Sequence, residues 1–269
     1  MSNYDELGTR IKANYEQISN HRLTRRTPVI IRIDGKAFHS FTKGFDRPFD
    51  EVLGNAMVRT MEYLCNNIQG CIFGYTQSDE ISLVLSDYKK LTTDAWFDYK
   101  IQKMCSVAAS MATMAFNKYF EEGVKKFYLE DFYVGFQYEC RPKHKKAFEL
   151  YNNYQKALKK GAMFDARVFN IPKEEVVNGI YWRQLDAARN SVQMVGQANF
   201  SDSELHGKSC NMVQDMLHEQ RGINWNDYPT RWKRGVCWTK TKGIDYEMPM
   251  LKGEDRKYLE DLVWHVEEE

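Results

Sequence analysis

The sequence predicts an α+β protein whose core is ferredoxin-like, with the element order β-α-β-β-α-β. Three observations indicate this fold: a β-branched run just before Gly35, two further strand-like runs separated by a polar turn, and helical spacing of apolar residues in the stretches between strands. In this arrangement the first and third strands lie side by side and antiparallel.

Each element follows from its local pattern. The first run, VIIRID, lies between Pro28 and Gly35, as expected of a buried strand. The polar TQSDE between CIFGY and ISLVL has the size of a hairpin turn. The last run, DARVFNI, ends at Pro172. The predicted core has strands at 29–34, 71–75, 81–85 and 165–171, and helices at 48–67 and 95–120.

We expect a single domain over residues 1–269, because no repeat, low-complexity tract or Gly/Ser linker divides the chain. Its core spans about residues 28–171 and includes a helical insertion at 121–164 before the last strand. Residues from about 172 to 269 form a helical C-terminal extension. Further helices are predicted at 4–16 and 173–193.

Composition and charge exclude several classes of protein. The chain has no apolar run of membrane-spanning length, and no apolar stretch follows positive charge at its N-terminus. We therefore expect a cytoplasmic protein without a membrane partner. The six cysteines never approach CxxC spacing, which disfavours a structural zinc site. With 38 basic and 37 acidic residues, any surface for nucleic acid must be local.

Two aspartates carry the strongest chemical signal. Asp34 ends the first strand and Asp79 lies in the turn before the third, so antiparallel pairing brings both carboxylates to one point. Neighbouring carboxylates repel, and ionising both requires a cation. Oxygen ligands favour Mg²⁺, which keeps substrate phosphates as partners. Either acid alone is more readily explained as a turn residue; together they indicate metal ligation that suits nucleotidyl transfer.

The loop after Asp34 adds a second feature. We expect DGKAFHSF to hold a triphosphate through backbone N–H groups, because Gly35 permits close approach. The Walker A pattern GxxxxGK[ST] is absent from the sequence. For His39, a core position and a contact with phosphate or base both remain open.

The motifs RIDGKAFHSF, GYTQSDEISLVL, FDARV and YWRQLDAARN together resemble the tRNA-His guanylyltransferase family, and within it the guanylyltransferase-like 3'-to-5' polymerases. The match runs from about residue 32 to residue 235. The resemblance implies a catalytic core like the palm of polymerases, two Mg²⁺ ions, ATP or GTP as substrates, tRNA as partner and a homotetramer.

The resemblance also assigns roles to residues. Asp34 and Asp79 match the metal-binding aspartates, the carbonyl of Gly35 matches a backbone ligand, and Glu80 matches an acid that supports catalysis. Without the resemblance, the lysines near residue 100 would be expected on a solvated helix face. The matched nucleotide-binding positions are Lys36, Ala37, Phe38, His39, Arg47, Ser78, Lys100, Lys103 and Asn224.

Two kinds of position are candidates for RNA contact. Arg167 matches an arginine beside the bound nucleotide or RNA, and Arg183 lies in the matched YWRQ motif. Residues 141–160 contain seven basic residues against the single acid Glu149, so they are a candidate RNA surface, with a solvated helix as the alternative. The candidates from this basic stretch are Lys143, Lys145 and Lys146.

One departure from the family pattern bears on function. Members that add the extra guanosine to tRNA-His carry a His-Ile-Asn-Asn-rich segment after the Trp-Arg-Gln motif. Here the run is AARNSVQMV, with Ala188 in place of the histidine. The resemblance therefore implies the branch that repairs 5'-truncated tRNA by templated addition. A dedicated tRNA-His guanylyltransferase, a palm-type nucleotidyl cyclase and an RNA-binding module are the alternatives.

Overall fold

The central sheet has six strands in the order β4-β1-β3-β2-β5-β6, and every neighbouring pair is antiparallel. It is seen in a computed structural model that describes residues 3–90, 92–129 and 141–264. The expected antiparallel pairing of the first and third strands is confirmed, with Asp34 opposite Glu80. The strands are β1 Val29–Gly35, β2 Cys71–Gln77, β3 Glu80–Leu85, β4 Phe164–Asn170, β5 Val236–Thr239 and β6 Gly243–Asp245.

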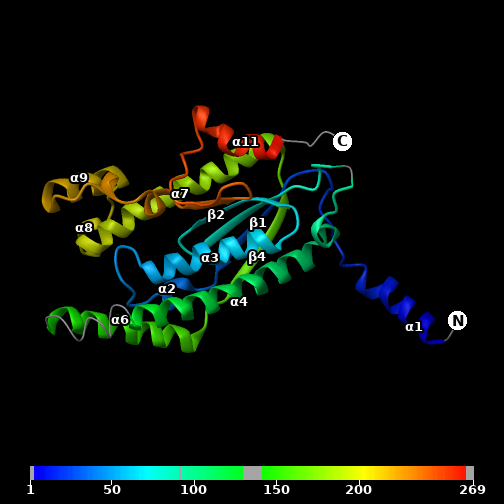
Figure 1. Cartoon of the computed structure of the whole chain (residues 1–269), viewed down its shortest axis with the longest axis horizontal. Coiled ribbons are helices and arrows are strands. Elements are labelled where there is room, and N and C mark those ends of the chain that lie inside the picture. Colours follow the sequence, from blue (N-terminus) through cyan, green and yellow to red (C-terminus); the bar gives the residue numbers. More distant parts are fainter. Residues whose placement is uncertain (1–2, 91, 130–140, 265–269) are drawn as a thin grey trace.

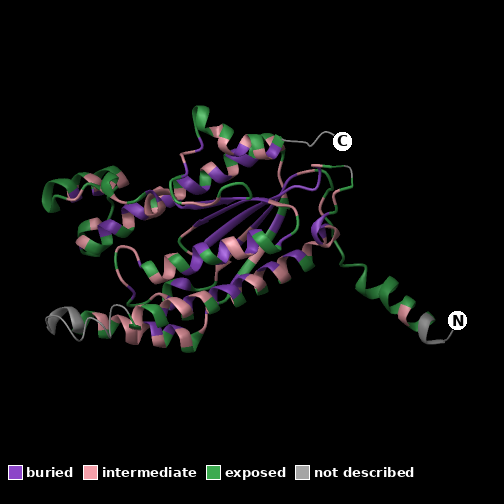
Figure 2. Ribbon diagram, viewed as in Figure 1, coloured by how far each residue is buried: buried purple, intermediate pink, exposed green. Residues whose placement is uncertain are grey.

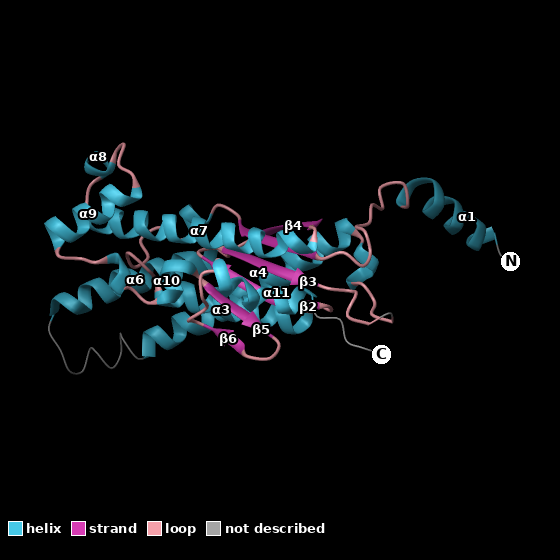
Figure 3. Ribbon diagram, turned by 90° about the horizontal axis from the view of Figure 1, so that it is seen from above, coloured by secondary structure: helices cyan, strands magenta, loops and turns pink. Residues whose placement is uncertain are grey.

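Helices cover both faces of this sheet (Figures 1 and 3). The helices α3 (Glu51–Asn67) and α4 (Ile101–Phe127) pack on one face, and α7 (Lys173–Asn199) and α11 (Lys257–Trp264) pack on the other. Alternate residues of β1 serve the two faces: Ile31 packs in the α3/α4 core, whereas Ile30 packs in the α7/α11 core. By this alternation, Asp34 lies on the α7 face.

Buried residues line the strands and the helix surfaces that face them (Figure 2). Every residue of β3 is buried, since β1 and β2 flank it and helices cover both faces of the sheet. On the α4 side, the core is rich in phenylalanine, and the ring of Phe116 stacks on that of Phe120 with centroids 5.7 Å apart. The site residues are therefore attached to a rigid core.

The long helix differs from its prediction at both ends. It begins at Ile101 rather than near residue 95, because Phe97, Asp98 and Tyr99 have left-handed φ angles of 51°, 53° and 53°. L-residues adopt such angles at a cost, so a helix cannot pass through them. The helix continues to Phe127, into the expected insertion, and the basic stretch forms α6 (Arg141–Lys160).

The prediction of a helical C-terminal extension was incomplete. The extension adds β5 to the edge of β2, where Val236 is opposite Thr76, and β6 follows it. These strands have four and three residues, too few for a clear alternating pattern. The other C-terminal elements are α8 Asp202–Leu205, α9 Cys210–Arg221, η4 Trp225–Asp227, α10 Thr230–Arg234 and η5 Gly253–Arg256.

The N-terminal helix stands away from the body of the molecule (Figures 1 and 3). It consists of α1 (Asn3–Ile11) and η1 (Lys12–Glu16), and its apolar residues are exposed. Among the described residues, no helix combines the length and apolar character that crossing a membrane requires.

The loop between β1 and α3 contains a short helix, α2 (Phe38–Phe41). This helix lies over the phenylalanine core, because Phe38 and Phe41 are both buried in it. The backbone N–H of Lys36 donates to the carbonyl of Met163, which ties the loop to the start of β4. The loop is thus held at the edge of the sheet where β1 ends.

Candidate active site

The structure brings Asp34 and Asp79 to neighbouring turns at the same end of the sheet, where β1 ends and β3 begins. Asp34 is the penultimate residue of β1, and its register partner on β3 is Glu80, the residue after Asp79. The backbone N–H of Gly35 donates to the carbonyl oxygen of Asp79 at 3.1 Å, which joins the two motifs directly. The side chain of Asp34 is 41% exposed, so a ligand can reach it.

The β2–β3 turn fixes the orientation of Asp79. Ser78 has a left-handed φ of 50°, and its hydroxyl donates to the Asp79 carboxylate at 3.0 Å. Burial raises the pKa of Asp79, the negative charge of Asp34 raises it further, and the hydrogen bond from Ser78 opposes both effects. A cation bound between these acids would remove the electrostatic cost of ionising them.

The donor set fits Mg²⁺. Two carboxylates and backbone carbonyls supply oxygen only, which this ion prefers, and it completes its shell with water and phosphate oxygens. Over residues 3–90, 92–129 and 141–264, no group of three or more His, Cys, Asp or Glu side chains is arranged to hold a metal. A two-carboxylate site of this kind depends on the substrate for its remaining ligands.

Glu80 is held by an ion pair on the protein side of the site. Its carboxylate lies 2.6 Å from Arg183 Nε, and both side chains are only 10% exposed. Arg183 also contacts Asp186 at 2.9 Å. Burial raises the pKa of Glu80, although the charge of Arg183 lowers it. Because this guanidinium is buried and engaged, the geometry does not favour the sequence-based prediction that Arg183 binds RNA.

Glycine is needed at position 35 for a different reason from the close approach of a phosphate that the sequence suggested. A side chain at Gly35 would place its Cβ 2.2 Å from Cδ2 of Phe38, so glycine is required by the packing of that ring. Phe38 is 5% exposed and its centroid lies 5.1 Å from that of Phe164. Phe38 therefore has only its backbone to offer a nucleotide. Ala37 has a left-handed φ of 55°, which turns the chain into α2.

Several exposed polar residues surround this loop. Lys36 and His39 are exposed, which excludes the core position for His39. Lys160, at the end of α6, donates from Nζ to the hydroxyl of Ser40 at 2.5 Å. Arg47 is exposed further along the loop. Cationic side chains from the loop and from α6 are thus exposed around the segment that follows Asp34.

The basic helix α6 contacts the same loop near its other end. The Nζ atom of Lys146 lies 2.8 Å from the carboxylate of Asp46, and Lys145 is exposed. The side chain of Lys143 lies outside the described residues. The helix therefore offers exposed basic residues, as the sequence indicated, but Lys146 is paired with an acid of the loop.

The register reveals two residues that sequence reasoning did not single out. Asp165 on β4 is directly opposite Asp34, and Arg32 on β1 is directly opposite Arg167. Arg167 lies 3.5 Å from Asp165 and 3.9 Å from Asp34. The face near the acid pair thus carries an acidic row and, two residues further along the strands, a basic row. Finding them required the strand pairing.

Lys100 and Lys103 lie at the opposite end of the sheet. Thr113, on the middle of α4, contacts Phe164, which is the register partner of Gly35. Lys100 precedes Thr113 by 13 residues, or about 20 Å along a helix. Both lysines instead line a cavity of about 430 Å³ with Arg25, Gln69 and Asp98. The structure does not bring them to the acids of their own chain.

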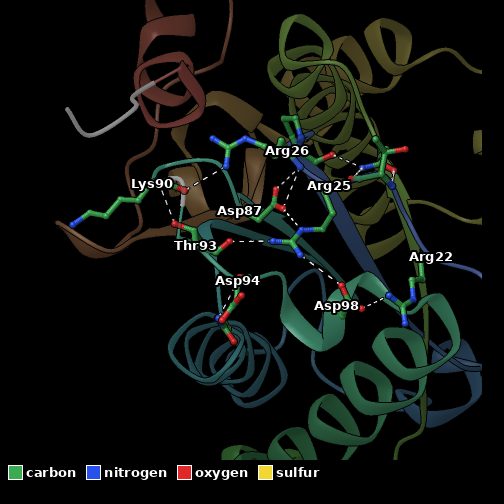
Figure 4. A network of polar contacts seen from close by, with 12 residues as sticks. Arg22, Arg25, Arg26, Asp87, Lys90, Thr93, Asp94 and Asp98 are labelled. Carbon is green, nitrogen blue, oxygen red and sulfur yellow. Dashed lines mark hydrogen bonds and ion pairs between the residues drawn. The ribbon is translucent and has the colours of Figure 1, made fainter. Parts of the chain in front are cut away.

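This opposite end is organised by a network of ion pairs (Figure 4). The buried carboxylate of Asp87 accepts from Arg25 Nε at 2.7 Å and from the backbone N–H of Arg26 at 2.9 Å. Asp98 pairs with Arg22 and, at 3.5 Å, with Arg25. The network fixes the chain before β1 against the left-handed turn that precedes α4.

Asn224 is used locally by the fold. Its side-chain oxygen accepts from the backbone N–H of Asn226 at 3.1 Å, which caps η4. Another asparagine, Asn190 on α7, lines a small cavity of about 90 Å³ together with Ser78, which precedes Asp79, and with Trp232. Asn190 belongs to the run AARNSVQMV that follows the Trp-Arg-Gln motif.

Two acids at adjacent strand tips of an antiparallel α+β sheet, beside a tight basic loop, are the arrangement of a nucleotidyltransferase. The comparison with known proteins gives the family. The model of the tRNAHis guanylyltransferase family matches residues 9–172, and the chain belongs to this family.

Solved structures show the same fold over nearly the whole chain. A bacterial tRNA(His) guanylyltransferase-like protein in complex with ATP is 40% identical, with a TM-score of 0.79, over 96% of this chain and 99% of that one. A second, in complex with GTP, is 36% identical, with a TM-score of 0.70 and the same coverage. The tRNA(His) guanylyltransferase of Schizosaccharomyces pombe is 25% identical over 88% of this chain and 83% of its own length.

Proposed function

We propose that this protein adds nucleotides to the 5' end of tRNA, templated by the opposite strand, and so repairs 5'-truncated tRNA. The observation that carries the proposal is the placement of Asp34 and Asp79 at adjacent turns, joined by the hydrogen bond from Gly35 to Asp79. The strand order β4-β1-β3-β2 supports a ferredoxin-like core comparable to the palm of polymerases, within one catalytic domain over residues 1–269.

The proposed reaction has two steps. First, an oxygen of the RNA 5'-monophosphate attacks the α-phosphorus of ATP or GTP; a P–O bond forms, and pyrophosphate leaves. Second, the 3'-hydroxyl of an incoming nucleoside triphosphate attacks the activated 5'-phosphorus. A nucleoside monophosphate leaves, and the hydroxyl proton passes to water. The chain grows at its 5' end and keeps a triphosphate there.

Asp34 and Asp79, with the Gly35 carbonyl, would hold two Mg²⁺ ions. When bound, Mg²⁺ lowers the pKa of an attacking hydroxyl and balances the charge of leaving pyrophosphate. Ser78 orients the Asp79 carboxylate through its hydrogen bond. Glu80 acts as a positioning residue, because its carboxylate is already paired with Arg183.

The loop and its surroundings bind the triphosphate. Lys36 and Arg47 are exposed and can place positive charge beside phosphate without exchanging a proton. Residues 37–39 offer the backbone at the start of α2. Lys160 is added to the predicted set, because it reaches the same loop from α6.

RNA contact is proposed to be mostly electrostatic. Pairing with the opposite strand selects the incoming nucleotide, so the protein need not read bases. Arg167 beside Asp34, and Lys145 with Lys146 on α6, are the exposed cations assigned to phosphate contacts. Binding should therefore weaken steeply as salt rises.

Ala188 favours repair over dedicated guanosine addition to tRNA-His. It stands on α7 where the resemblance places a histidine in the dedicated enzymes, and it is half-buried. An alanine offers no hydrogen bond to a base or phosphate. A preference for tRNA-His among intact tRNAs would reverse this assignment.

The test supplies labelled GTP, Mg²⁺ and a 5'-monophosphorylated tRNA that lacks its first nucleotide, and maps which end grows. We expect growth at the 5' end. Asp34→Ala and Asp79→Ala should each lower the rate about 10³-fold or more, because each removes a metal ligand. Asp215→Ala, an exposed residue on α9, is the matched control and should retain the wild-type rate.

Other products would contradict the proposal. A cyclic nucleotide or growth at the 3' end would instead identify a conventional palm enzyme. Wild-type extension by Asp79→Ala would disprove the assignment of the metal site.

A further inference from the structure

An open strip of the sheet lies beside the acid pair, on the α7 face of β1 and β4. Ala166 and Val168 of β4 point into the α3/α4 core, so Asp165, Arg167 and Phe169 point to the opposite side, where each is exposed. β4 is an edge strand, with β1 as its only strand neighbour in this sheet. The strip thus adjoins Asp34 on β1 and is open to a ligand.

The basic row on this strip is only partly compensated within the protein: the charge of Arg32 interacts favourably with the Glu80 carboxylate and lowers its pKa, against the effect of burial. Arg32 and Arg167 are directly opposite each other, and like charges opposite each other across a strand pair are destabilising. Among the residues that the structure describes, Arg167 forms ion pairs of 3.5 and 3.9 Å with exposed partners, which contribute little. Within residues 3–90, 92–129 and 141–264, the buried Nε atom of Arg32 has no hydrogen-bond partner. An anion bound on the strip would satisfy both guanidinium groups.

An exposed tryptophan lies next to this row. The side chain of Trp182 on α7 is 55% exposed, and its ring centroid lies 5.8 Å from Cζ of Arg32. Arg183, clamped by Glu80 and Asp186, lies 4.4 Å from the same ring and supports it from the protein side. Trp182 is therefore held in place while much of its surface remains available.

We propose that this strip binds the reacting end of the RNA, with Trp182 stacked on a base and Arg32 and Arg167 bound to backbone phosphate. Aromatic surfaces combined with guanidinium groups suit unpaired or terminal nucleotides, whose bases stack on any flat ring. The basic row lies two residues from the acids along the strands, or about 7 Å. RNA bound there delivers its 5'-phosphate to Asp34.

This inference rests on the proposed function, since it assigns the RNA to the same site. It gives Arg183 a physical role consistent with its burial: the guanidinium supports the ring on which the base stacks. It also explains why a large aromatic residue is exposed at this point of α7. Burial of Trp182 in the protein would leave no stacking surface.

The experiment uses tryptophan fluorescence, because stacking on a base quenches the indole. The probe is a 5'-monophosphorylated RNA hairpin with an unpaired template nucleotide opposite the missing position. It is titrated into the full chain at low salt with Mg²⁺ and without nucleotide. Trp182→Phe should bind this RNA as wild type does but lose the quenching. Trp264→Phe, which removes another exposed tryptophan on α11, is the control and should keep it.

Affinity gives the second readout. Trp182→Ala should weaken RNA binding about 10-fold, as expected for one stacked base, without changing the affinity for GTP alone. Arg32→Gln should reduce the slope of log K against log salt by about one, because one phosphate contact is lost. Unchanged RNA affinity in Trp182→Ala, or equal quenching in Trp182→Phe, would overturn the proposal. Quenching by GTP alone would assign the strip to the nucleotide instead.

Failure of this inference and failure of the proposed function give different results. The fluorescence experiment reads RNA contact without turnover. Quenching of Trp182 by RNA in an enzyme that adds no nucleotide would support RNA binding at the strip and contradict the proposed function. Efficient 5' extension together with unaltered RNA affinity in Trp182→Ala would contradict only the strip.

Discussion

Asp79 is placed where its own charge is disfavoured, and the reason lies in its neighbours. Burial and the charge of Asp34 both raise the pKa of Asp79, whereas Ser78 partly offsets them. The unfolded chain has neither effect. A group whose pKa is raised by folding favours the folded state below its unfolded pKa, and this contribution is lost as the pH rises through the folded pKa. At neutral pH without metal, the wild type is thus destabilised by this carboxylate.

Asp79→Asn should therefore raise the free energy of unfolding at pH 7 in the absence of Mg²⁺. The gain should shrink as the pH falls below the folded pKa of Asp79, because the wild-type carboxyl is then protonated as well. Thermal unfolding of the variant and the wild type at pH 7 and pH 4 measures the gain in stability and its decrease at low pH. The variant should nevertheless lose nucleotide addition. A variant less stable than wild type at pH 7 would mean that the Asp34–Asp79 repulsion is not what the structure indicates.

For the buried pair of Glu80 and Arg183, we expect that removing one charge lowers stability, in contrast to Asp79→Asn. Arg183→Gln leaves a carboxylate unpaired at a position that is 10% exposed, and should lower stability by about 3 kcal/mol. Adding Glu80→Gln to that variant should recover part of the loss, because no buried charge then remains unpaired. Urea denaturation of the single and double variants measures this coupling. Additive losses would show that the two side chains stabilise the fold independently.

The acids were predicted from the sequence because their positions at strand tips follow from local patterns. The burial of Arg183 and Phe38 was not predicted, because a motif match cannot tell a side chain that faces a ligand from one that packs beneath it. The opposed pairs, Asp34 with Asp165 and Arg32 with Arg167, depend on strand register. Register across an intervening helix and insertion is not encoded in any short segment.

At the scale of elements, the turn from β1 into α2 couples packing to the site. The absence of a side chain at Gly35 lets the ring of Phe38 lie against the backbone, and the same residue donates to Asp79. The four central strands were predictable from their runs and turn. The start of α4 was not, because three consecutive left-handed residues outside glycine have no sequence signature.

Gly35→Ala should lower stability by about 1–3 kcal/mol and impair nucleotide addition, since the new methyl group would meet the Phe38 ring at 2.2 Å. Adding Phe38→Leu should restore part of the stability by making room. Denaturant unfolding and the extension rate measure both effects. Gly8→Ala, on a helix where a Cβ meets nothing within 4 Å, is the control and should not destabilise the protein. Tolerance of Gly35→Ala would show that the loop shifts without affecting the acids.

At the scale of the whole molecule, the N-terminal helix leaves apolar side chains exposed, and the homotetramer implied by the resemblance stays a prediction. Its apolar residues recur every three or four positions, as on one face of a helix, and lie in solvent. Such a face is usually covered by another chain. They are Leu7 at 48%, Ile11 at 40% and Tyr15 at 69% exposure, and Ile18, in the turn after the helix, is 72% exposed.

Assembly also decides how Lys100 and Lys103 could take part in the reaction. Lys100 lies about 20 Å and Lys103 about 15 Å along α4 from Thr113, which marks the level of the acids in their own chain, so we expect a contact with triphosphate to use the acids of another copy. We expect the double variant Lys100→Ala/Lys103→Ala and the double variant Asp34→Ala/Asp79→Ala to be inactive separately. Co-expressed, they should recover about a quarter of wild-type activity, because random pairing of copies joins intact lysines to intact acids at that frequency.

The matched control for this complementation is co-expression of Asp34→Ala with Asp79→Ala. It should stay inactive, because both acids of a site come from one chain, where Gly35 and Asp79 are joined by a hydrogen bond. An active Lys100→Ala/Lys103→Ala enzyme would remove these lysines from the triphosphate site altogether. If the enzyme is inactive alone and remains so in the mixture, the lysines act within their own chain, through the ion-pair network around Asp98 that orders the start of α4.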